Sequence, residues 1–279
     1  MVTAIILNWN GLAATQRCLA ALGGQARAIV VDNGSTDGSA EQLPGALKLA
    51  ENLGFAGGMN HGLALVQDPY VLLLNNDAEL APDAVEKLVA ALEADPTAAA
   101  AAPTIYHGHP PDRAQVWFAG GTLSRRTATV HHQLRPDAGT HAVSYLSACC
   151  LLLRREALAA VGGLPEGYFM YFEDAELCDR LAAAGHRLLW VGAAEAWHAG
   201  GASTGSEQAK APALDYYDVR NSLLFARRRR LGPLPWLYLF AVRLPRKLAR
   251  IALGRQWSSL PAVWRGLLDG LAGHEGPQP

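Results

Sequence analysis

The sequence predicts an α/β fold in which helices flank a mostly parallel central sheet and a C-terminal helical extension follows. In the first half of the chain, short apolar runs alternate with segments of helical periodicity, which is the pattern of βαβ units. Polar turns rich in Asn, Asp and Gly directly follow several of these apolar runs. From Pro212 onward the pattern is helical and amphipathic, with basic and aromatic residues interleaved.

Each element is predicted from its own pattern of apolar residues. Apolar runs bounded by turn residues predict strands at residues 2–7, 28–31, 47–50, 70–74, 145–153 and 186–191. Apolar residues at helical spacing predict helices at residues 12–22, 57–66, 82–94, 155–161 and 172–184. Pro82 suits the first turn of its helix, and Gly185 suits a C-terminal cap. Residues 108–139 predict loops with short strands, and the alanine run at 98–102 is interpreted as composition only.

The length of 279 residues predicts one large α/β domain with an appendage. We place the α/β domain at residues 1–211, with one half over 1–103 and a second half over 104–211. The helical extension is expected at residues 212–279. The formal net charge of -1 argues against nucleic acid as a partner, although basic residues gather between Arg227 and Arg255.

The cysteines and the apolar segments indicate a cytoplasmic protein. None of the four cysteines forms a CxxC pair, which favours a reduced compartment. The apolar first residues lack the basic lead-in and cleavage site of a signal peptide. No apolar run reaches the roughly 18 residues that span a bilayer, so contact with a membrane would be peripheral.

Three polar loops follow predicted strands, at residues 8–11, 32–39 and 75–79. Because the carboxyl ends of parallel strands share one edge of a sheet, these loops are expected to converge on one site. The loop beginning at Asp32 is equally well interpreted as a turn whose side chains satisfy local backbone groups. Asp77 and Glu79 follow a strong strand, where carboxylate oxygens suit Mg²⁺ or Mn²⁺ bound to a diphosphate. The alternative, an N-cap cluster for the next helix, fits Asp83 better than Asp77.

Two further features carry possible chemistry. Glu173 and Asp174 follow an aromatic run, and adjacent carboxylates in such surroundings make a partly desolvated acid–base site. Acidic residues at a helix start also favour the helix macrodipole, so a structural role is the alternative. His198 precedes a glycine-rich turn, and a single histidine is more often packed or solvated than catalytic.

Together these motifs resemble the family 2 glycosyltransferases, especially the rhamnosyltransferase-like branch. The resemblance runs from Val2 to Leu224 on seven segments in the family's order: NWNG, VDNGSTDGS, ENLGFAGGMNHG, LLLNNDAEL, RREALAAVGGLPEGYFMYFEDAELCDRL, WHAGGAST and YYDVRNSL. It implies the GT-A fold, a Rossmann-like α/β sheet, and inverting transfer of a sugar from a nucleotide diphosphate. The catalytic domain would then be residues 1–211, with a nucleotide-sugar half over 1–103 and an acceptor half over 104–211. The branch implies dTDP-rhamnose as the donor.

The resemblance also implies roles for single residues. The donor would lie against positions from the first four motifs and a late basic position: Asn8, Trp9, Asn10, Asp32, Gly57, Asn60, Asn76 and Arg220. Glycines in the third motif would let the nucleotide approach the backbone closely, and Asn60 would open the following helix. Arg220 would bind the diphosphate.

Metal and catalytic roles follow in the same way. Asp77 resembles the last acidic residue of the family's DxD motif, whose earlier positions here are Asn75 and Asn76. His198 would complete the metal shell around Mg²⁺ or Mn²⁺. Asp174 resembles the family's catalytic base, with Glu173 beside it in the substrate site.

The extension is expected to bring the enzyme to its acceptor. Its arginines and aromatic residues, such as Trp236, Tyr238 and Phe240, suggest interfacial helices on an anionic leaflet. The alternative is a set of helices packed on the catalytic domain with a solvated arginine face. The first interpretation predicts a peripheral protein on the inner face of the cell membrane, with a glycan or polyprenyl-diphosphate-linked acceptor.

The alternative functions are a sugar-phosphate nucleotidyltransferase and a non-catalytic binding module. A sugar-phosphate nucleotidyltransferase should carry a basic, glycine-rich loop after the first strand, whereas this chain has NWNGLAATQR with one glycine and no lysine. A degenerate transferase kept as a binding module would have no need of Asp77, Asp174 and His198 together.

Overall fold

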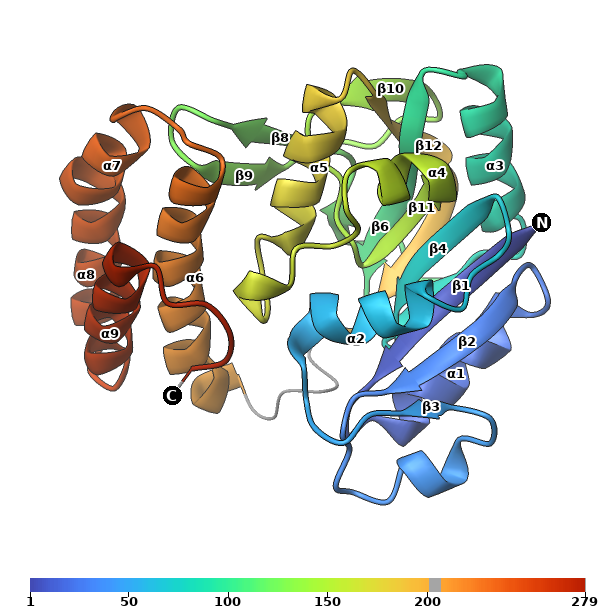
Figure 1. Cartoon of the computed structure of the whole chain (residues 1–279), viewed down its shortest axis with the longest axis horizontal. Coiled ribbons are helices and arrows are strands. Elements are labelled where there is room, and N and C mark those ends of the chain that lie inside the picture. Colours follow the sequence, from blue (N-terminus) through green and yellow to red (C-terminus); the bar gives the residue numbers. More distant parts are fainter. Residues whose placement is uncertain (201–206, 279) are drawn as a thin grey trace.

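A ten-stranded mixed sheet forms the centre of the molecule (Figure 1). The computed structural model describes the backbone of residues 1–200 and 207–278, and the side chains of residues 1–200 and 212–278. The strands are β1 (Val2–Asn8), β2 (Arg27–Asp32), β3 (Leu47–Lys48), β4 (Tyr70–Asn75), β5 (Ala78–Leu80), β6 (Ala98–His107), β7 (Val116–Phe118), β8 (Gly121–Ser124), β9 (Thr129–His132), β10 (Thr140–Val143), β11 (Cys150–Arg154) and β12 (Arg187–His198).

Helices cover the sheet and form the C-terminal end. They are α1 (Leu12–Leu22), α2 (Gly54–Leu63), α3 (Ala84–Ala94), α4 (Arg155–Ala160), α5 (Glu173–Ala183), α6 (Glu207–Arg228), α7 (Leu234–Tyr238), α8 (Leu244–Leu253) and α9 (Ser259–Ala272), with the short turns η1 (Ala40–Gln42), η2 (Glu166–Tyr168) and η3 (Leu239–Arg243). Within the described residues, no helix is both long and apolar enough to cross a bilayer.

The strand order confirms the predicted α/β fold. The sheet runs β10-β12-β6-β11-β4-β1-β2-β3, with β5 on β12 and β7 on β6, while β8 and β9 form a separate pair. Strand β1 is parallel to both β2 and β4, and β6 is parallel to β12. Strand β11 is antiparallel to both of its neighbours. The middle strands are apolar because helices cover both faces, as Ile5 and Leu73 illustrate by their complete burial.

The alanine run at 98–102 is a strand, so its interpretation as composition was wrong. It forms the first half of β6, between β11 and β12, and is almost completely buried. Alanine has a low β propensity, but burial on both faces of a sheet overrides propensity. Helix α3 packs on this strand, and methyl side chains allow a close approach.

Other differences concern where elements begin and end. The strand predicted at 145–153 starts at Cys150, and the residues before it belong to the loop between β10 and β11. Pro82 precedes α3 instead of lying in its first turn. Strand β12 continues to His198 after a register shift between Val191 and Glu195. This longer strand carries His198 to the edge of the sheet.

The C-terminal helices lie together at one end of the molecule (Figure 1). Helices α6 and α9 pack closely because Gly266 and Gly270 face α6, where an added Cβ would lie 2.5 Å from the Tyr216 carbonyl oxygen and 2.6 Å from Leu223 Cδ1. Phe225 of α6 belongs to the main hydrophobic core. The predicted domain boundary at residue 211 therefore falls inside a helix that joins both parts.

Candidate active site

The polar loops after β1, β2 and β4 meet at the carboxyl edge of the sheet, which confirms the predicted convergence. Asn8 Nδ2 donates to Asp32 Oδ2 at 2.7 Å and to Ser39 Oγ at 2.9 Å. Thr15 Oγ1 donates to Asn8 Oδ1 at 2.7 Å, and Asn76 Nδ2 donates to Thr15 Oγ1 at 3.1 Å. One buried hydrogen-bond network therefore links all three loops.

Both oxygens of the Asp32 carboxylate are engaged within the loop that it begins. Oδ1 accepts the Ser35 backbone N–H at 3.0 Å, and Oδ2 accepts the Ser35 hydroxyl at 2.7 Å. Asn10 joins the two loops, since its Oδ1 accepts the Thr36 N–H at 2.8 Å. Trp9 lies partly exposed between these contacts. Asp32 and Asn10 thus shape the loops, and their recognition of a nucleotide stays a prediction.

Helix α2 differs from the expectation for the glycine-rich motif. It starts at Gly54, so Asn60 lies inside the helix and does not open it. The Asn60 amide donates to the Leu164 carbonyl at 2.9 Å and accepts the Leu164 N–H at 3.1 Å, which ties α2 to the loop before α5. Added Cβ atoms at Gly57 and Gly58 would lie 2.8 Å from Leu53 Cβ and 2.3 Å from Leu7 Cδ1. These glycines serve close packing within the domain.

Arg220 is buried inside the protein, away from solvent, and its contacts do not support the predicted diphosphate role. Its Nη2 donates to the Tyr168 carbonyl at 2.6 Å, and its Nε donates to Asn221 Oδ1 at 2.8 Å. The guanidinium also lies 4.9 Å from the ring centroid of Tyr217 and 5.3 Å from that of Tyr216. A completely buried guanidinium with these partners is a structural group.

Asp77 and His198 form the candidate metal-binding pair. His198 Nε2 lies 3.1 Å from Asp77 Oδ1, and both side chains are mostly buried. The end of β12 runs antiparallel to β5, with His198 opposite Ala78, and the Ala199 N–H donates to the Asp77 carbonyl at 3.0 Å. Backbone pairing therefore fixes the two side chains against each other. Glu79 turns elsewhere, because its Oε1 lies 2.5 Å from His109 Nδ1.

The pair fits a divalent cation as two of its ligands. Two ligands at right angles around Mg²⁺ or Mn²⁺ lie about 3 Å apart when each bond is about 2.1 Å long. The His198 Nε2 to Asp77 Oδ1 distance matches that separation. In the part of the chain that the structure describes, no three His, Cys, Asp or Glu side chains gather as a metal site.

Glu173 and Asp174 begin α5 and face the same edge. Asp174 Oδ2 accepts the Tyr145 hydroxyl at 2.6 Å, and Oδ1 accepts the Ala175 N–H at 2.8 Å. Asp174 remains partly accessible, whereas Glu173 is buried and its Oε2 has no hydrogen-bond partner among the described residues. The two neighbouring carboxyl groups therefore differ in solvation and in the hydrogen bonds they receive.

These surroundings shift the pKa values of Glu173 and Asp174 to different extents. Burial, and then the charge of Asp174, raise the pKa of Glu173 to about 8. Burial also raises the pKa of Asp174 from its ordinary value, while the hydrogen bond from Tyr145 opposes that shift. Glu173 is therefore mainly protonated at neutral pH, and Asp174 is the group that carries charge and can accept a proton.

An aromatic wall connects the two ends of the site, and sequence patterns did not identify it. The His132 ring stacks on Tyr145 with centroids 5.7 Å apart, and Trp117 lies 4.9 Å from His132. Trp117 also lies 4.9 Å from the His198 ring. The wall thus runs from the partner of Asp174 to the partner of Asp77. Burial lowers the pKa of His132, so the wall is uncharged at neutral pH.

The carboxylates of Asp77 and Asp174 both influence the pKa of one buried thiol, that of Cys149. Burial raises the pKa of Cys149, and the charges of Asp77 and Asp174 raise it further. Cys149 directly precedes β11, and its carbonyl accepts the Asn75 N–H at 2.9 Å. All four cysteines are buried and free.

The family model for glycosyl transferase family 2 matches residues 3–162. An N-acetylglucosaminyl-diphospho-decaprenol L-rhamnosyltransferase of Mycobacterium tuberculosis is 30% identical, over 75% of this chain and 78% of that protein. The chain belongs to glycosyltransferase family 2. The rhamnosyltransferase WbbL of Escherichia coli is 43% identical over 20% of this chain and 21% of its own length.

Solved structures confirm the GT-A fold of this family 2 glycosyltransferase. The mannosyltransferase PcManGT of Pyrobaculum calidifontis, in complex with GDP-Man and Mn²⁺, has a TM-score of 0.58 at 20% identity, covering 98% of this chain and 76% of that one. S. aureus TarS 1-349 with UDP-GlcNAc has a TM-score of 0.60 at 15% identity, covering 98% and 81%. The chain is therefore an inverting GT-A glycosyltransferase that resembles rhamnosyltransferases.

Proposed function

We propose that this enzyme transfers rhamnose from dTDP-rhamnose to a sugar on a polyprenyl diphosphate, with Asp174 as the general base. The observation that carries the proposal is the aromatic wall that joins Asp174 to the Asp77–His198 pair. A transferase needs a proton acceptor for the acceptor hydroxyl and charge stabilisation for the leaving diphosphate, with the sugar between them. Aromatic faces suit the apolar side of a sugar.

The chemistry follows from the solvation of the groups. Asp174 takes the proton of the acceptor hydroxyl as the oxygen bonds to the anomeric carbon, and the bond to the diphosphate breaks on the opposite face. This single displacement inverts the anomeric configuration. We assign Glu173 to the acceptor site beside Asp174 because its buried Oε2 has no hydrogen-bond partner among the described residues. Asp77 and His198 would hold Mg²⁺ or Mn²⁺, which would supply positive charge to the leaving diphosphate.

The donor and acceptor are proposed from the relatives. The Mycobacterium tuberculosis relative carries both in its name, which specifies rhamnose and an N-acetylglucosaminyl-diphospho-decaprenol. A lipid-linked acceptor lies at a membrane surface, so this proposal places the enzyme at that surface during transfer.

A nucleotide-sugar screen tests the proposal. At 100 times the dissociation constant, a ligand stabilises the native state by about 2.7 kcal/mol, which raises the melting temperature by about 5 °C or more. We expect this rise with dTDP-rhamnose and Mn²⁺, and smaller rises with UDP-GlcNAc and GDP-mannose. Radiolabelled rhamnose should then appear on a polyprenyl-diphosphate GlcNAc. Binding with neither transfer nor slow donor hydrolysis would instead identify a non-catalytic module.

The C-terminal helices support membrane contact through some of the residues that the sequence suggested, such as Phe240, and not through others. Trp236 packs against both hydrophobic cores and is not a surface anchor. Most exposed large hydrophobic side chains of the described residues lie beyond Pro233: Leu234, Leu237, Phe240, Leu248, Leu253, Trp257, Trp264, Leu268 and Leu271. Exposed apolar side chains at this density mark a surface that binds a partner or a membrane.

The arginines of the extension contribute less to the surface charge than expected. Arg228 Nε lies 2.9 Å from Glu176 Oε2, and Arg229 Nε lies 2.5 Å from Asp179 Oδ2. Lys247 Nζ lies 2.7 Å from Asp215 Oδ1. These cations are paired within the protein, which agrees with the alternative of helices packed on the domain. The proposed surface therefore depends more on apolar burial than on the number of arginines.

We expect the full-length protein to co-sediment with anionic phosphatidylglycerol vesicles. Moderate salt should weaken binding without abolishing it, because apolar burial is insensitive to screening. The double variant Trp257→Ser and Trp264→Ser should lower the bound fraction severalfold, since each exposed indole leaves the headgroup zone. Leu134→Ser is the control, because Leu134 is similarly exposed but lies outside the C-terminal helices. Equal binding of all three proteins would contradict membrane contact through α8 and α9.

A further inference from the structure

The residues directly before the candidate base adopt a backbone conformation that their side chains disfavour. Phe169, Tyr171 and Phe172 have φ angles of 65°, 66° and 76°, in the left-handed region. L-residues with bulky side chains rarely enter this region, and none of the three is glycine or asparagine. Such conformations persist only where surrounding contacts impose them, and they gather at functional sites.

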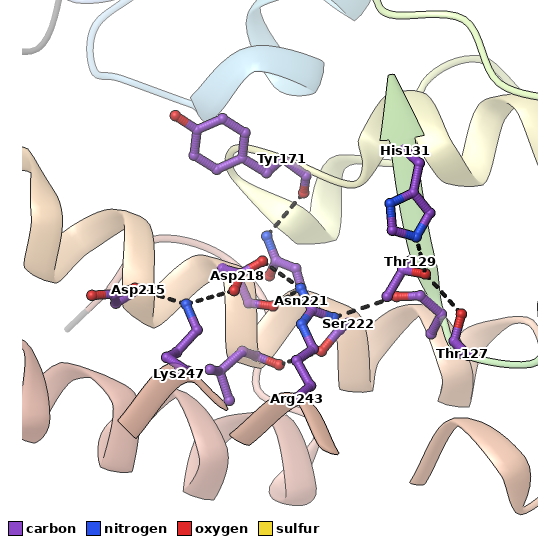
Figure 2. A network of polar contacts seen from close by, with 12 residues as sticks. Thr127, Thr129, His131, Tyr171, Asp215, Asp218, Asn221, Ser222, Arg243 and Lys247 are labelled. Atoms are coloured by element: carbon purple, nitrogen blue, oxygen red, sulfur yellow. Dashed lines mark hydrogen bonds and ion pairs between the residues drawn. The ribbon is translucent and has the colours of Figure 1, made fainter. Parts of the chain in front are cut away.

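Asn221 supplies those contacts from α6. Its Nδ2 donates to the Met170 carbonyl at 2.7 Å and to the Tyr171 carbonyl at 2.9 Å, the latter drawn in Figure 2. A longer contact of 3.3 Å reaches the Tyr168 carbonyl. Asn221 is completely buried, so water does not compete for these carbonyls. One side-chain amide thus holds the backbone of the left-handed segment.

Arg220 fixes the orientation of that amide. Its Nε donates to Asn221 Oδ1 at 2.8 Å, so the NH₂ end of Asn221 must face the carbonyls. Arg220 also donates through Nη2 to the Tyr168 carbonyl at 2.6 Å. The arginine therefore holds both the start of the segment and the group that binds its middle.

The opposite side of the segment is held by the nucleotide-sugar half of the domain. The Phe55 N–H donates to the Phe169 carbonyl at 2.7 Å. An added Cβ at Gly54 would lie 2.3 Å from the Phe169 carbonyl oxygen, so only glycine permits this approach. The segment is clamped between α2 and α6, immediately before Glu173 and Asp174.

Helix α6 is itself anchored by the extension. Lys247 Nζ lies 2.6 Å from Asp218 Oδ2 and 2.7 Å from Asp215 Oδ1, and Arg243 also pairs with Asp218 (Figure 2). Arg220 follows Asp218 by two residues, and its Nη1 donates to the Gly276 carbonyl at 2.5 Å. The position of Asn221 is thereby coupled to α8 and to the C-terminal end of the chain.

We propose that Asn221, oriented by Arg220, is a positioning residue that holds the left-handed segment so that Asp174 keeps its hydrogen bond from Tyr145. The inference rests on the proposed role of Asp174 as base, and it assigns a function to the RN pair of α6 that differs from donor binding. Without the clamp, the segment relaxes toward ordinary φ values, and the start of α5 moves away from the loop that carries Tyr145 and Ala148.

The variant Asn221→Ala tests the proposal, with Ser222→Ala as the matched control. Ser222 is also buried, but its hydroxyl donates only to the Val219 carbonyl of its own helix. We expect Asn221→Ala to lower kcat by about 10- to 100-fold, the size of effect that follows a small misplacement of a catalytic group. The KM for the donor should remain as in the wild type, and Ser222→Ala should retain the wild-type kcat.

Two further measurements separate positioning from general destabilisation. Release of the segment removes the hydrogen bond from Tyr145, which lowers the pKa of Asp174, so the acid limb of the kcat–pH profile should move to higher pH in Asn221→Ala. Amide hydrogen exchange should increase at residues 168–174 and remain unchanged in β1 and β4. An unchanged pH profile with wild-type exchange at 168–174 would overturn the proposal. If the wild-type protein transfers no sugar, the proposed function fails, while the exchange experiment still decides the clamp.

Combining Tyr171→Gly with Asn221→Ala provides a second test, which remains informative even if the single variant Asn221→Ala does not fold. Glycine adopts φ near 66° without steric penalty, so the clamp is needed less in that background. The kcat loss caused by Asn221→Ala should be at least about threefold smaller there. If Asn221→Ala alone does not fold, recovery of folded protein in the double variant supports the proposal. Failure of the double variant to improve folding or kcat overturns it.

Discussion

Asp174→Asn is expected to lower sugar transfer by about 10²-fold or more, the range typical for loss of a general base. Asparagine keeps the shape of the side chain but cannot accept the proton of the acceptor hydroxyl. The Tyr145 hydroxyl can rotate to accept a hydrogen bond from the new amide, so the local packing should survive. Steady-state transfer assays at saturating dTDP-rhamnose, together with donor titrations by thermal shift, provide the measurement.

Glu173→Gln is the matched control for this substitution. The pKa of Glu173 is raised to about 8, so glutamine imitates the protonated form that prevails at neutral pH. Its loss of transfer should therefore be clearly smaller than that of Asp174→Asn. A collapse of donor affinity in Asp174→Asn, with turnover of bound donor retained, would make Asp174 a binding residue.

The pH dependence of the wild type adds a check on the same assignment. The base acts only when deprotonated, so transfer should fall as pH decreases through the pKa of Asp174. Because burial raises that pKa, the fall should begin at a higher pH than for an exposed aspartate. The limb should vanish in the residual activity of Asp174→Asn.

The sequence predicted the half of the fold whose patterns are local. Alternating apolar runs and helical segments located β1, α1, β2 and β4 to within about one residue, because each buries its own apolar face. The convergence of Asn8 and Asp32 followed from the topology of parallel strands. Strand β6 was missed because alanine gives no strand signal, and only burial between β11 and β12 makes that segment a strand.

The site residues that lie in sequence motifs could be predicted, whereas those brought together only by tertiary packing could not. Asp174, Asp77 and His198 lie in recognisable motifs, and the structure brings Asp77 to His198. Tyr145 was predicted only as part of a strand and Trp117 lies in a segment without periodicity, so only tertiary packing reveals their alignment. Arg220 lies in a motif, but the motif alone did not reveal its role. An arginine at this position is as compatible with a buried structural contact as with binding a diphosphate.

Composition beyond Pro212 indicated an exposed surface but misplaced some of its residues, such as Trp236. The basic and aromatic residues beyond Pro212 predicted amphipathic helices, and these are present. Pairing with acidic residues could not be predicted, because Glu176 and Asp179 lie on α5, some 50 residues before Arg228 and Arg229. Charge counts along a sequence do not reveal which charges fold against one another.

Asp77→Ala is expected to remove the stimulation of transfer by Mn²⁺ and to lower turnover by at least about 10²-fold. A bound cation contributes several kcal/mol of charge stabilisation to a leaving diphosphate, and each 1.4 kcal/mol changes the rate about tenfold. The substitution leaves the His198 imidazole as the remaining member of the pair. The fold should survive, because β5 and β12 are joined through the backbone of Asp77, whose carbonyl accepts the Ala199 N–H at 3.0 Å.

The matched control for Asp77→Ala is Glu79→Gln, which removes a carboxylate two residues away. Glu79 pairs with other side chains, since its Oε1 lies 2.5 Å from His109 Nδ1 and 3.9 Å from Arg17 Nε. It should therefore retain stimulation by Mn²⁺. Electron paramagnetic resonance of Mn²⁺ with dTDP gives a second readout without turnover, and the bound signal should be lost in Asp77→Ala and retained in Glu79→Gln. Full Mn²⁺-stimulated transfer by Asp77→Ala at saturating donor would contradict the metal-binding role, because the imidazole of His198 alone cannot replace the charge of the carboxylate.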